Sequence, residues 1–257
     1  MSTLAAIILT RNEAAHVQAC IDSVRFADLV LVVDSLSADG TQDLARAAGA
    51  EVIERPFEDY ADQRNAALEA VQARADWVLF VDADERITPE LAAEVRSTLG
   101  ETGYAGWRIP RHNYIFGRLT RGAGWYPDYQ TRLLRVGAAH YMPEHRVHER
   151  VELDGELGTL NAHIVHYNYT DVRQFLDKQR RYTAYEAQVM VEQGIRPKPQ
   201  NYILQPLRHF RWRFLTLGGW RDGLHGLRLC LLMSWYEFRK YVLLRRLWQN
   251  QQAGQEG

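Results

Sequence analysis

Residues 77–85 read WVLFVDADE, and this stretch decides the fold. Four consecutive apolar residues, 78–81, lead directly into Asp82, Ala83 and Asp84. A continuous apolar run of this length is typical of a strand that is buried on both faces, as in a parallel sheet. Asp82 and Asp84 are therefore expected at the carboxyl end of a strand and, two residues apart, on the same side of it.

The paired carboxylates predict a site for a cation or for a ligand rich in hydrogen-bond donors. Two close carboxylates repel each other when nothing lies between them. Oxygen ligands suit Mg²⁺ or Mn²⁺, and either ion can in turn hold a diphosphate. A structural alternative also fits, because Thr88-Pro89-Glu90 is a good helix start and the two aspartates could serve only as its cap.

The flanking sequence alternates between strand and helix patterns. Strands are expected at residues 4–9, 29–33, 51–53 and 77–81, and the segments between them have helical periodicity near 17–24, 42–48 and 60–72. This alternation predicts an α/β fold with a parallel, nucleotide-binding type of sheet and helices on both faces. Ligands of such sheets bind beyond the carboxyl ends of the strands. Polar residues lie at three of these ends: Arg11 and Asn12, Asp34 and Ser35, and Asp82 and Asp84.

From Gly103 onward the pattern changes to shorter strands separated by Gly and Pro, the last of them expected at 160–167. Helices are expected from the cap Asp171 to Glu192, at about 202–215 and at about 220–248. The predicted organisation is a catalytic domain at 1–195, a basic amphipathic helical extension at 196–250 and a disordered tail at 251–257.

Composition limits the function classes. Hydrophobic content of 46% and charged content of 25% over 257 residues fit an ordinary globular chain. Cys20 and Cys230 form no metal-spaced cluster and fit free thiols in a reducing cytosol. The N-terminal apolar run lacks the flanks of a signal peptide, and no stretch reaches the roughly 18 apolar residues of a membrane-spanning helix. The absence of GxGxxG after the first strand, and of GxxxxGK[ST] anywhere, argues against a dinucleotide-binding domain or a P-loop.

The formal net charge of -1 hides a strong asymmetry. Residues 196–250 hold eleven Lys or Arg against Asp222 and Glu237, a net +9, whereas residues 1–195 hold 20 basic and 29 acidic residues, a net -9. Basic amphipathic helices rich in aromatic residues bind anionic membrane surfaces. The alternative is that the apolar face packs on the catalytic domain and the arginines are only solvated. No nucleic-acid-binding motif accompanies the charge, so nucleic acid is not the expected partner.

The chain resembles the family 2 inverting glycosyltransferases of the GT-A fold, and within them the bacterial lipopolysaccharide-core β-1,4-glucosyltransferase group. The resemblance covers nearly the whole length. The Asp-x-Asp pair alone is not specific, because acidic pairs at strand ends are common, but the ordered set of motifs is. This set consists of TRNE at 10–13, DS at 34–35, QRN at 63–65, DADE at 82–85, WYP at 125–127, Gln130 with Arg132, VHE at 147–149, and Asp222-Gly223 with Gly226.

The resemblance implies an inverting, single-displacement transfer of a hexose, glucose by likeness, from a UDP-sugar to a lipid-linked saccharide. The enzyme would use Mn²⁺ or Mg²⁺ and work in the cytoplasm, peripherally on the inner membrane. By resemblance Asp84 is a direct metal ligand, and Asp82 reaches the ribose or the metal through water. Among the five histidines at 140, 145, 148, 163 and 166, His166 is the one expected to supply a further ligand to the metal or to contact the diphosphate. The implied substrate-binding residues are Thr10, Arg11, Glu13, Asp34, Arg64, Asp82, Trp125, Gln130 and Arg132.

Some of these residues also have a purely structural interpretation. Arg64 would lie over the phosphates or the donor sugar, where a guanidinium matches phosphate oxygens, or would be an exposed helix arginine. Trp107, Trp125 and Tyr126 are candidates for stacking on sugar faces or for ordinary packing. The histidines from 140 to 166 match no zinc pattern.

Glu149 is the expected general base, because a carboxylate can deprotonate the acceptor hydroxyl as the transition state develops. The alternatives are Glu144 and Asp128, or a surface carboxylate at 149 that pairs with Arg146 or Arg150. Two other function classes stay open. A sugar nucleotidyltransferase would carry a glycine-rich basic loop where this chain has TRNEAAH, and a non-catalytic membrane-docking scaffold would not need a complete set of catalytic candidates.

Overall fold

The computed structural model describes residues 2–142 and 151–253 and divides the chain into two compact units. The first unit comprises Met1–His112 and Asp128–His166, and the second comprises Asn113–Pro127 and Tyr167–Gly257. The division into functional domains at 1–195, 196–250 and 251–257 stays a prediction, since compact units are defined by packing alone.

The first unit alternates strands and helices before it turns into a mixed β region. Its elements are β1 (Leu4–Thr10), α1 (Val17–Ser23), β2 (Leu29–Asp34), α2 (Thr41–Ala47), β3 (Glu51–Glu54), α3 (Tyr60–Val71), β4 (Trp77–Asp82), β5 (Glu85–Ile87), α4 (Pro89–Thr98), β8 (Tyr129–Arg135), β9 (Ala139–Tyr141), β10 (Val151–Leu153) and β11 (Glu156–Thr159). β6 (Tyr104–Ile115) and β12 (Ile164–Tyr169) begin in the first unit and end in the second. The four strands predicted before residue 85 are therefore confirmed to within one residue.

The main sheet has the strand order β3-β2-β1-β4-β8-β6-β12-β5. β3, β2, β1 and β4 are parallel, and β8 joins β4 in the antiparallel direction. Because β1 is flanked by β2 and β4, the carboxyl ends of these three strands meet at one edge of the sheet. The prediction of an α/β fold with a largely parallel sheet is confirmed.

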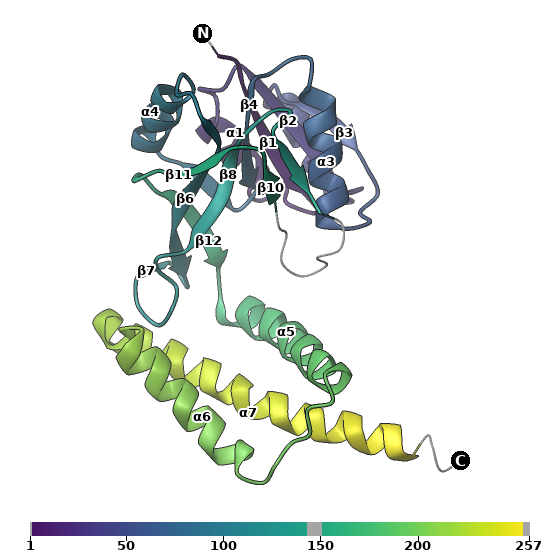
Figure 1. Cartoon of the computed structure of the whole chain (residues 1–257), viewed down its shortest axis with the longest axis vertical. Coiled ribbons are helices and arrows are strands. Elements are labelled where there is room, and N and C mark those ends of the chain that lie inside the picture. The colour runs from purple at the N-terminus through teal and green to yellow at the C-terminus, as the bar shows by residue number, and fades with distance from the viewer. Residues whose placement is uncertain (1, 143–150, 254–257) are drawn as a thin grey trace. The chain divides into compact units, whose positions relative to one another are not determined.

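Helices cover both faces of the sheet in the first unit (Figure 1). Alternate residues of β1 point to opposite faces, as strand geometry requires. Leu4, Ala6 and Ile8 pack in the core that also holds apolar residues of α1, α2 and α4. Ala5 and Ile7 pack in a second core against α3. Burial on both faces explains why the sequence of β1 is continuously apolar.

The end of β4 differs from the expectation for Asp82 and Asp84. β4 ends at Asp82, and Ala83 and Asp84 form a turn before β5. The alternation of a strand therefore does not extend to Asp84. The aspartates do not cap the next helix either, because Thr88 caps α4 by accepting a hydrogen bond from the Leu91 amide at 3.2 Å. The capping alternative is wrong.

The strand predicted at 160–167 begins only at Ile164. The backbone amides of Asn161 and Ala162 donate hydrogen bonds to the Glu94 carboxylate, at 2.9 and 2.8 Å, instead of to a neighbouring strand. The Glu94 side chain on α4 thus accepts the hydrogen bonds from the backbone amides that strand pairing at 161–162 would require. The sequence around residue 160 gives no sign of this long-range contact.

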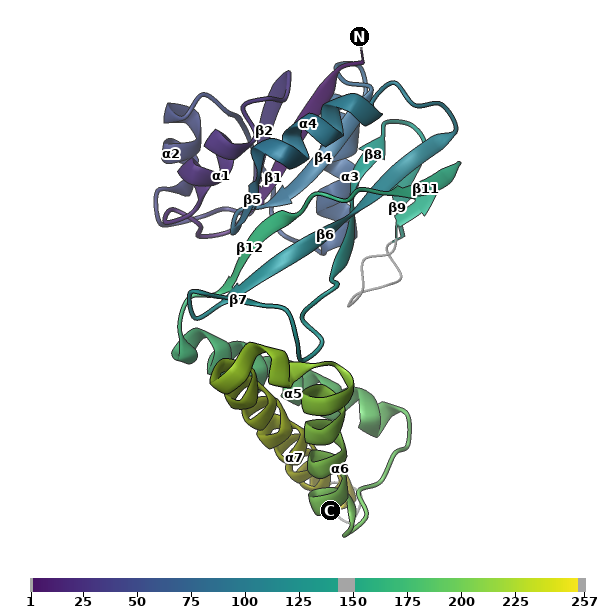
Figure 2. The ribbon, with the colours of Figure 1, turned by 90° about the vertical axis from the view of Figure 1, so that its left-hand side faces the viewer.

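The second unit is mainly helical. It contains β7 (Arg118–Thr120), α5 (Val172–Glu192), α6 (Asn201–Arg211), the π-helical turn η1 (Trp212–Thr216), the 3₁₀ turn η2 (Gly219–Asp222) and α7 (Gly223–Ala253). Asp171 caps α5 as predicted, accepting from the Gln174 amide at 2.8 Å. α7 packs against both α5 and α6, and α6 and α7 form a hairpin that Figures 1 and 2 show side by side.

The sequence predicted a disordered tail at 251–257. The structure differs at residues 251–253, because α7 continues through Ala253. Residues 254–257 lie outside the described part of the chain. Among the described residues, no helix is long and apolar enough to cross a membrane. Cys20 and Cys230 are free and buried, as their positions in the sequence predicted.

Candidate active site

The loops that follow β1 and β2 are tied together by hydrogen bonds. The Asn12 amide donates to Ser37 Oγ at 2.7 Å, and the Glu13 amide donates to Thr41 Oγ1 at 2.8 Å. Asn12 adopts a left-handed backbone with φ of 57°, which its residue type tolerates better than most. The parallel pairing of β1 with β2 brings the two loops to the same edge of the sheet, where they form one connected rim.

Asp34 is the centre of this rim and is 0% exposed. Its carboxylate accepts hydrogen bonds from Thr10 Oγ1 at 2.7 Å, the Ser37 amide at 2.7 Å and Gln42 Nε2 at 2.8 Å. Burial alone would raise the pKa of Asp34, but the donors of Ser37, Thr10 and Gln42 outweigh it and hold the pKa below its usual value. Asp34 is thus an ionised anchor that fixes the loops around it.

The turn after β4 is held by its own neighbours. Glu85 Oε2 accepts a hydrogen bond from the Asp82 amide at 3.0 Å, and Arg86 Nη1 donates to the carbonyl of Ala83 at 2.8 Å. These contacts satisfy backbone groups that the end of the strand leaves unpaired. The backbone of the turn that carries Asp82 and Asp84 is therefore held by residues of the DADER sequence itself.

Asp82 is neutralised by two arginines from different elements. Arg132, on β8, donates to both carboxylate oxygens, with Nη1 to Oδ1 at 3.2 Å. Arg64, on α3, lies 3.7 Å from Oδ1 and stacks over the Phe80 ring at 5.0 Å. Burial opposes ionisation, but the charges of Arg132 and Arg64 hold the pKa of Asp82 well below its usual range. Arg64 is 5% exposed, so it is not an exposed helix arginine.

Two charged residues of this network, Glu85 and Arg111, were not expected as site residues. Glu85 is 0% exposed and accepts from Arg132 Nη2 and Arg111 Nη1, both at 3.1 Å. Arg111, on β6, also donates to Asp128 Oδ2 from Nε and Nη2 at 2.9 and 2.7 Å. The signal in the sequence for Glu85 was its place directly after Asp84. Arg111 has none, because only the pairing of β6 with β8 brings it there.

Asp84 has a different partner. His166, on β12, lies with Nε2 3.5 Å from Asp84 Oδ2, and its side chain is largely buried. The contact follows from topology, because β12 pairs antiparallel with β5 and places His166 opposite Glu85, the residue after Asp84. The structure thus brings together Asp84 and His166, two of the three predicted metal ligands.

The donor set of Asp84 and His166 fits a divalent ion. Mg²⁺ typically takes one or two protein carboxylates together with water and substrate phosphates. With metal–ligand bonds of about 2.1 Å, two ligand atoms on one octahedral ion lie about 3.0–4.2 Å apart, and 3.5 Å falls within this range. Within residues 2–142 and 151–253 there is no group of three or more His, Cys, Asp or Glu that could hold a metal ion. An ion held by Asp84 and His166 would keep coordination positions for water and for substrate phosphates.

The other predicted residues lie in different places. Arg11 is exposed and Glu13 half-buried on the rim, and Gln130 Nε2 donates to Asp128 Oδ1 at 2.8 Å. Trp125 belongs to the second unit, where its ring packs edge-on against Tyr169 at 5.9 Å. Trp107 is buried in the core of the first unit, so its packing alternative is correct. Glu149 and Glu144 lie outside the described residues, and the role predicted for Glu149 is not tested.

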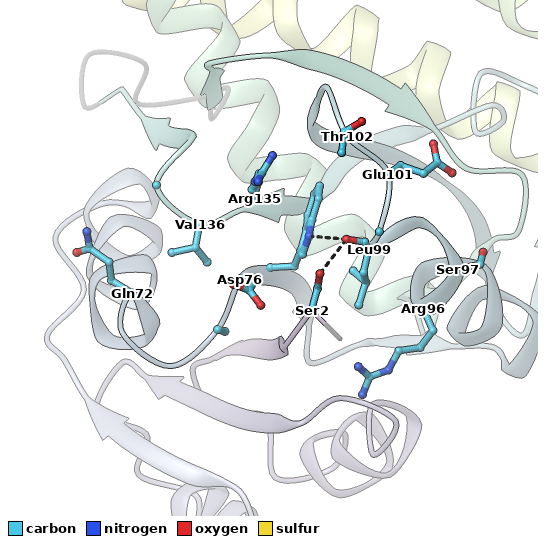
Figure 3. A pocket seen from close by; sticks show the side chains of 14 residues that line it. Ser2, Gln72, Asp76, Arg96, Ser97, Leu99, Glu101, Thr102, Arg135 and Val136 are labelled. Atoms are coloured by element: carbon cyan, nitrogen blue, oxygen red, sulfur yellow. Dashed lines mark hydrogen bonds between the residues drawn. The ribbon is translucent and has the colours of Figure 1, made fainter.

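A large surface pocket lies at the opposite edge of the sheet (Figure 3). It has a volume of about 1140 Å³ and is lined by Ser2, Asp76 and Trp77 at the amino ends of β1 and β4, and by the end of α4. Trp77 Nε1 and Ser2 Oγ donate hydrogen bonds to the Leu99 carbonyl at 3.2 and 3.1 Å. Figure 3 marks the bond between Ser2 and Leu99 with a dashed line. Ligands of parallel sheets bind at the carboxyl edge, so this pocket is not the predicted site.

The α/β fold with a DxD turn at the carboxyl edge of its parallel strands matches the fold expected of a glycosyltransferase of the GT-A type. The profile "Glycosyl transferase family 2" matches residues 5–146. The chain is 30% identical, over 91% of its length and 89% of the relative, to "Lipopolysaccharide core biosynthesis glycosyltransferase LpsC" of Rhizobium meliloti. The chain belongs to glycosyl transferase family 2.

Two further similarities accompany this assignment. An "Uncharacterized glycosyltransferase" of Rickettsia bellii is 28% identical over 95% of the chain and 86% of that protein. The crystal structure of glucosyl-3-phosphoglycerate synthase from Mycobacterium tuberculosis with Mn²⁺, UDP and phosphoglyceric acid is 26% identical. It aligns with 42% of this chain and 43% of that chain, with a TM-score of 0.36.

Proposed function

We propose that the protein transfers a hexose, glucose by family likeness, from a UDP-sugar to a lipid-linked saccharide of the lipopolysaccharide core or a related surface glycan. The reaction takes place at the cytoplasmic face of an anionic inner membrane. The observation that carries the proposal is the Asp84–His166 pair beside an arginine-neutralised Asp82 at the carboxyl edge of the sheet. The name of the LpsC relative supports the choice of acceptor.

The nucleoside of the donor binds on the rim formed by the loops after β1 and β2. Thr10, Arg11, Glu13 and Asp34 contribute to this surface, and the hydrogen bonds among the loops keep it in shape before the donor arrives. Preformed geometry reduces the entropy lost on binding. Because the oxygens of Asp34 are already occupied by internal donors, its contribution is mainly to hold Thr10 and Ser37 in place.

The diphosphate lies next to Asp84 and His166, which hold Mn²⁺ or Mg²⁺. When bound, the metal would neutralise charge that develops on the departing nucleoside diphosphate. Arg132 and Arg64 have a separate task. They cancel the charge of Asp82, so that a diphosphate approaching Asp84 does not also meet an uncompensated carboxylate.

The general base is Glu149, which takes the proton of the acceptor hydroxyl as that oxygen attacks the anomeric carbon. This assignment rests on the family motif, because residue 149 is outside the described structure. The geometry of Asp128, the alternative base, supports the choice indirectly. Arg111 donates two hydrogen bonds to its Oδ2 and Gln130 donates one to its Oδ1, so this carboxylate is already engaged in the ion network.

Calorimetric titration of a panel of UDP-, GDP- and ADP-sugars, with and without Mn²⁺, tests the donor site. We expect one donor to bind in a metal-dependent manner, and Asp84→Asn to weaken this binding by more than ~tenfold, since it removes a charged metal ligand. Asp76→Asn, at the opposite edge of the sheet, is the matched control and should bind the donor like the wild type.

Three results would contradict the proposal. Donor binding that depends neither on metal nor on Asp84 would show that the diphosphate does not bind at Asp84 and His166. If no donor binds although the protein is folded, the non-catalytic scaffold becomes the better description. Release of pyrophosphate from a nucleoside triphosphate and a sugar phosphate would instead identify a nucleotidyltransferase.

A further inference from the structure

The hairpin of α6, the two turns η1 and η2, and α7, residues 201–253, has an unusual solvent-facing surface. Large apolar side chains on it are exposed: Ile203, Leu204, Leu207, Trp212, Leu215, Trp220, Leu224, Leu231 and Trp235. Leu224 is 83% exposed, Leu231 54% and Trp235 53%. Monomeric soluble proteins rarely expose large contiguous apolar patches, and such patches mark interaction sites.

The exposed apolar residues of α7 lie on one side of the helix. Leu224, Arg228, Leu231, Trp235 and Arg239 follow each other at intervals of three or four residues, which places them in a single stripe. The stripe contains a shallow groove of about 370 Å³ lined by Leu224, Leu227, Arg228, Leu231, Leu232 and Trp235. The opposite side of α7 is buried within the second unit, at positions such as Leu229 and Tyr236.

The charges on the same surface are all of one sign. Between residues 201 and 250 every exposed charged side chain is an arginine: Arg208, Arg211, Arg221, Arg228, Arg239, Arg245 and Arg246. The two acidic residues of this range are engaged elsewhere. Asp222 accepts from the Gly122 amide at 2.7 Å, and Glu237 pairs with Lys240 at 2.8 Å.

The outer face of α5, in the same unit, has a different character. Its exposed charges are mixed, with Arg173 and Arg181 interspersed with Asp177, Glu186 and Glu192. A mixed face is what an ordinary solvated helix presents. The concentration of arginine and exposed leucine or tryptophan on the α6–α7 hairpin is therefore a local property, and it does not reflect the general composition of the unit.

We propose that the α6–α7 hairpin is a docking surface for an anionic phospholipid bilayer. Leu224, Leu231 and Trp235 enter the boundary between headgroups and acyl chains, and the arginines around them contact lipid phosphates. Interfacial helices combine an apolar stripe with flanking cationic residues in this way. The inference deepens the proposed function, because it rests on the lipid-linked acceptor and names the surface that brings the enzyme to it.

Flotation of the full chain with lipid vesicles tests the docking surface. We expect binding to vesicles of 30% phosphatidylglycerol in phosphatidylcholine, and at least ~tenfold weaker binding to pure phosphatidylcholine. Arg228→Glu with Arg239→Glu should lower the affinity for the anionic vesicles by more than ~tenfold, and so should Leu224→Ser with Leu231→Ser. Arg173→Glu with Arg181→Glu, on α5, makes the same change of charge and should alter it less than ~twofold.

Circular dichroism and thermal unfolding show whether each variant is folded, and tryptophan emission gives a second readout. Emission should shift to shorter wavelength when anionic vesicles are added, and less so in Trp235→Phe. Equal binding by all variants, or no vesicle binding by the wild type, would overturn the proposal. A self-associating wild type that Leu224→Ser with Leu231→Ser makes monomeric would assign the surface to a second copy of the chain.

The two proposals can fail separately. The rim with Asp34 and the Asp84–His166 pair, which are proposed to hold the donor, lie in the first unit, so the hairpin variants should retain donor binding. Vesicle binding without any donor binding would keep the docking surface and reject the transferase site. Donor binding without vesicle binding would keep the transferase site and reject the docking surface.

Discussion

At the scale of single residues, the ion network around Asp82 accounts for much of the site's geometry. Arg132 bridges Asp82 and the fully buried Glu85. Removing one partner of a buried ion pair leaves an uncompensated charge, which costs about 3–5 kcal/mol. We therefore expect Arg132→Met to lower the free energy of unfolding in urea by several kcal/mol. Arg74→Met removes an arginine that pairs with Glu51 on the exposed surface and should cost less than about 1 kcal/mol. Equal costs would contradict a buried network.

The same network predicts a pH dependence of stability. The charges of Arg132 and Arg64 outweigh burial and hold the pKa of Asp82 below its usual value in the folded protein. Its ionised form therefore stabilises the fold fully above the pKa of the unfolded chain, about 3.9, and less as the pH falls toward the folded value. The difference in unfolding free energy between wild type and Asp82→Asn should be about 1 kcal/mol smaller at pH 3 than at pH 6. A difference that grows in acid would contradict the assignment.

At the scale of elements, the start of α7 depends on a close approach of two backbone segments. A Cβ at Gly226 would lie 1.9 Å from the carbonyl oxygen of Gly219 in η2, where no side chain can fit. This steric demand explains the glycine at 226, which the family motif contains. We expect Gly226→Ala to destabilise the second unit by about 1–3 kcal/mol or more through overpacking. Asn250→Ala, exposed near the end of the same helix, should leave thermal unfolding almost unchanged. Equal melting temperatures would show that η2 can shift.

The elements also show what local sequence patterns can and cannot predict. β1, β2 and β4 are buried on both faces, so their apolar runs identified them to within a residue, and the caps Thr88 and Asp171 marked their helices correctly. Such local patterns do not predict which distant strands pair with each other. His166 was one of five candidate histidines between residues 140 and 166, and only the antiparallel pairing of β12 with β5 explains its position beside Asp84. Arg111 was missed because nothing near it in the sequence reports the pairing of β6 with β8.

At the scale of the whole molecule, the segregation of charge connects the two proposals. Residues 196–250 carry a net +9 and residues 1–195 a net -9. A surface whose exposed charges are all arginine attracts an anionic bilayer strongly at low ionic strength and weakly once salt screens it. The ion pairs of the active site are largely enclosed and are screened much less.

Salt should therefore separate capture of the lipid-bound acceptor from the chemistry at the donor site. We expect kcat/KM for acceptor embedded in anionic vesicles to fall more than ~tenfold between about 0.05 and 0.5 M NaCl, as the Debye length shortens from about 14 to about 4 Å. With a deacylated, water-soluble acceptor the change should be less than ~threefold. Arg228→Glu with Arg239→Glu should flatten the salt dependence in vesicles and leave the rate with the soluble acceptor unaltered. If both acceptors respond equally to salt, the basic hairpin does not deliver the enzyme to its acceptor, and the arginines have another role.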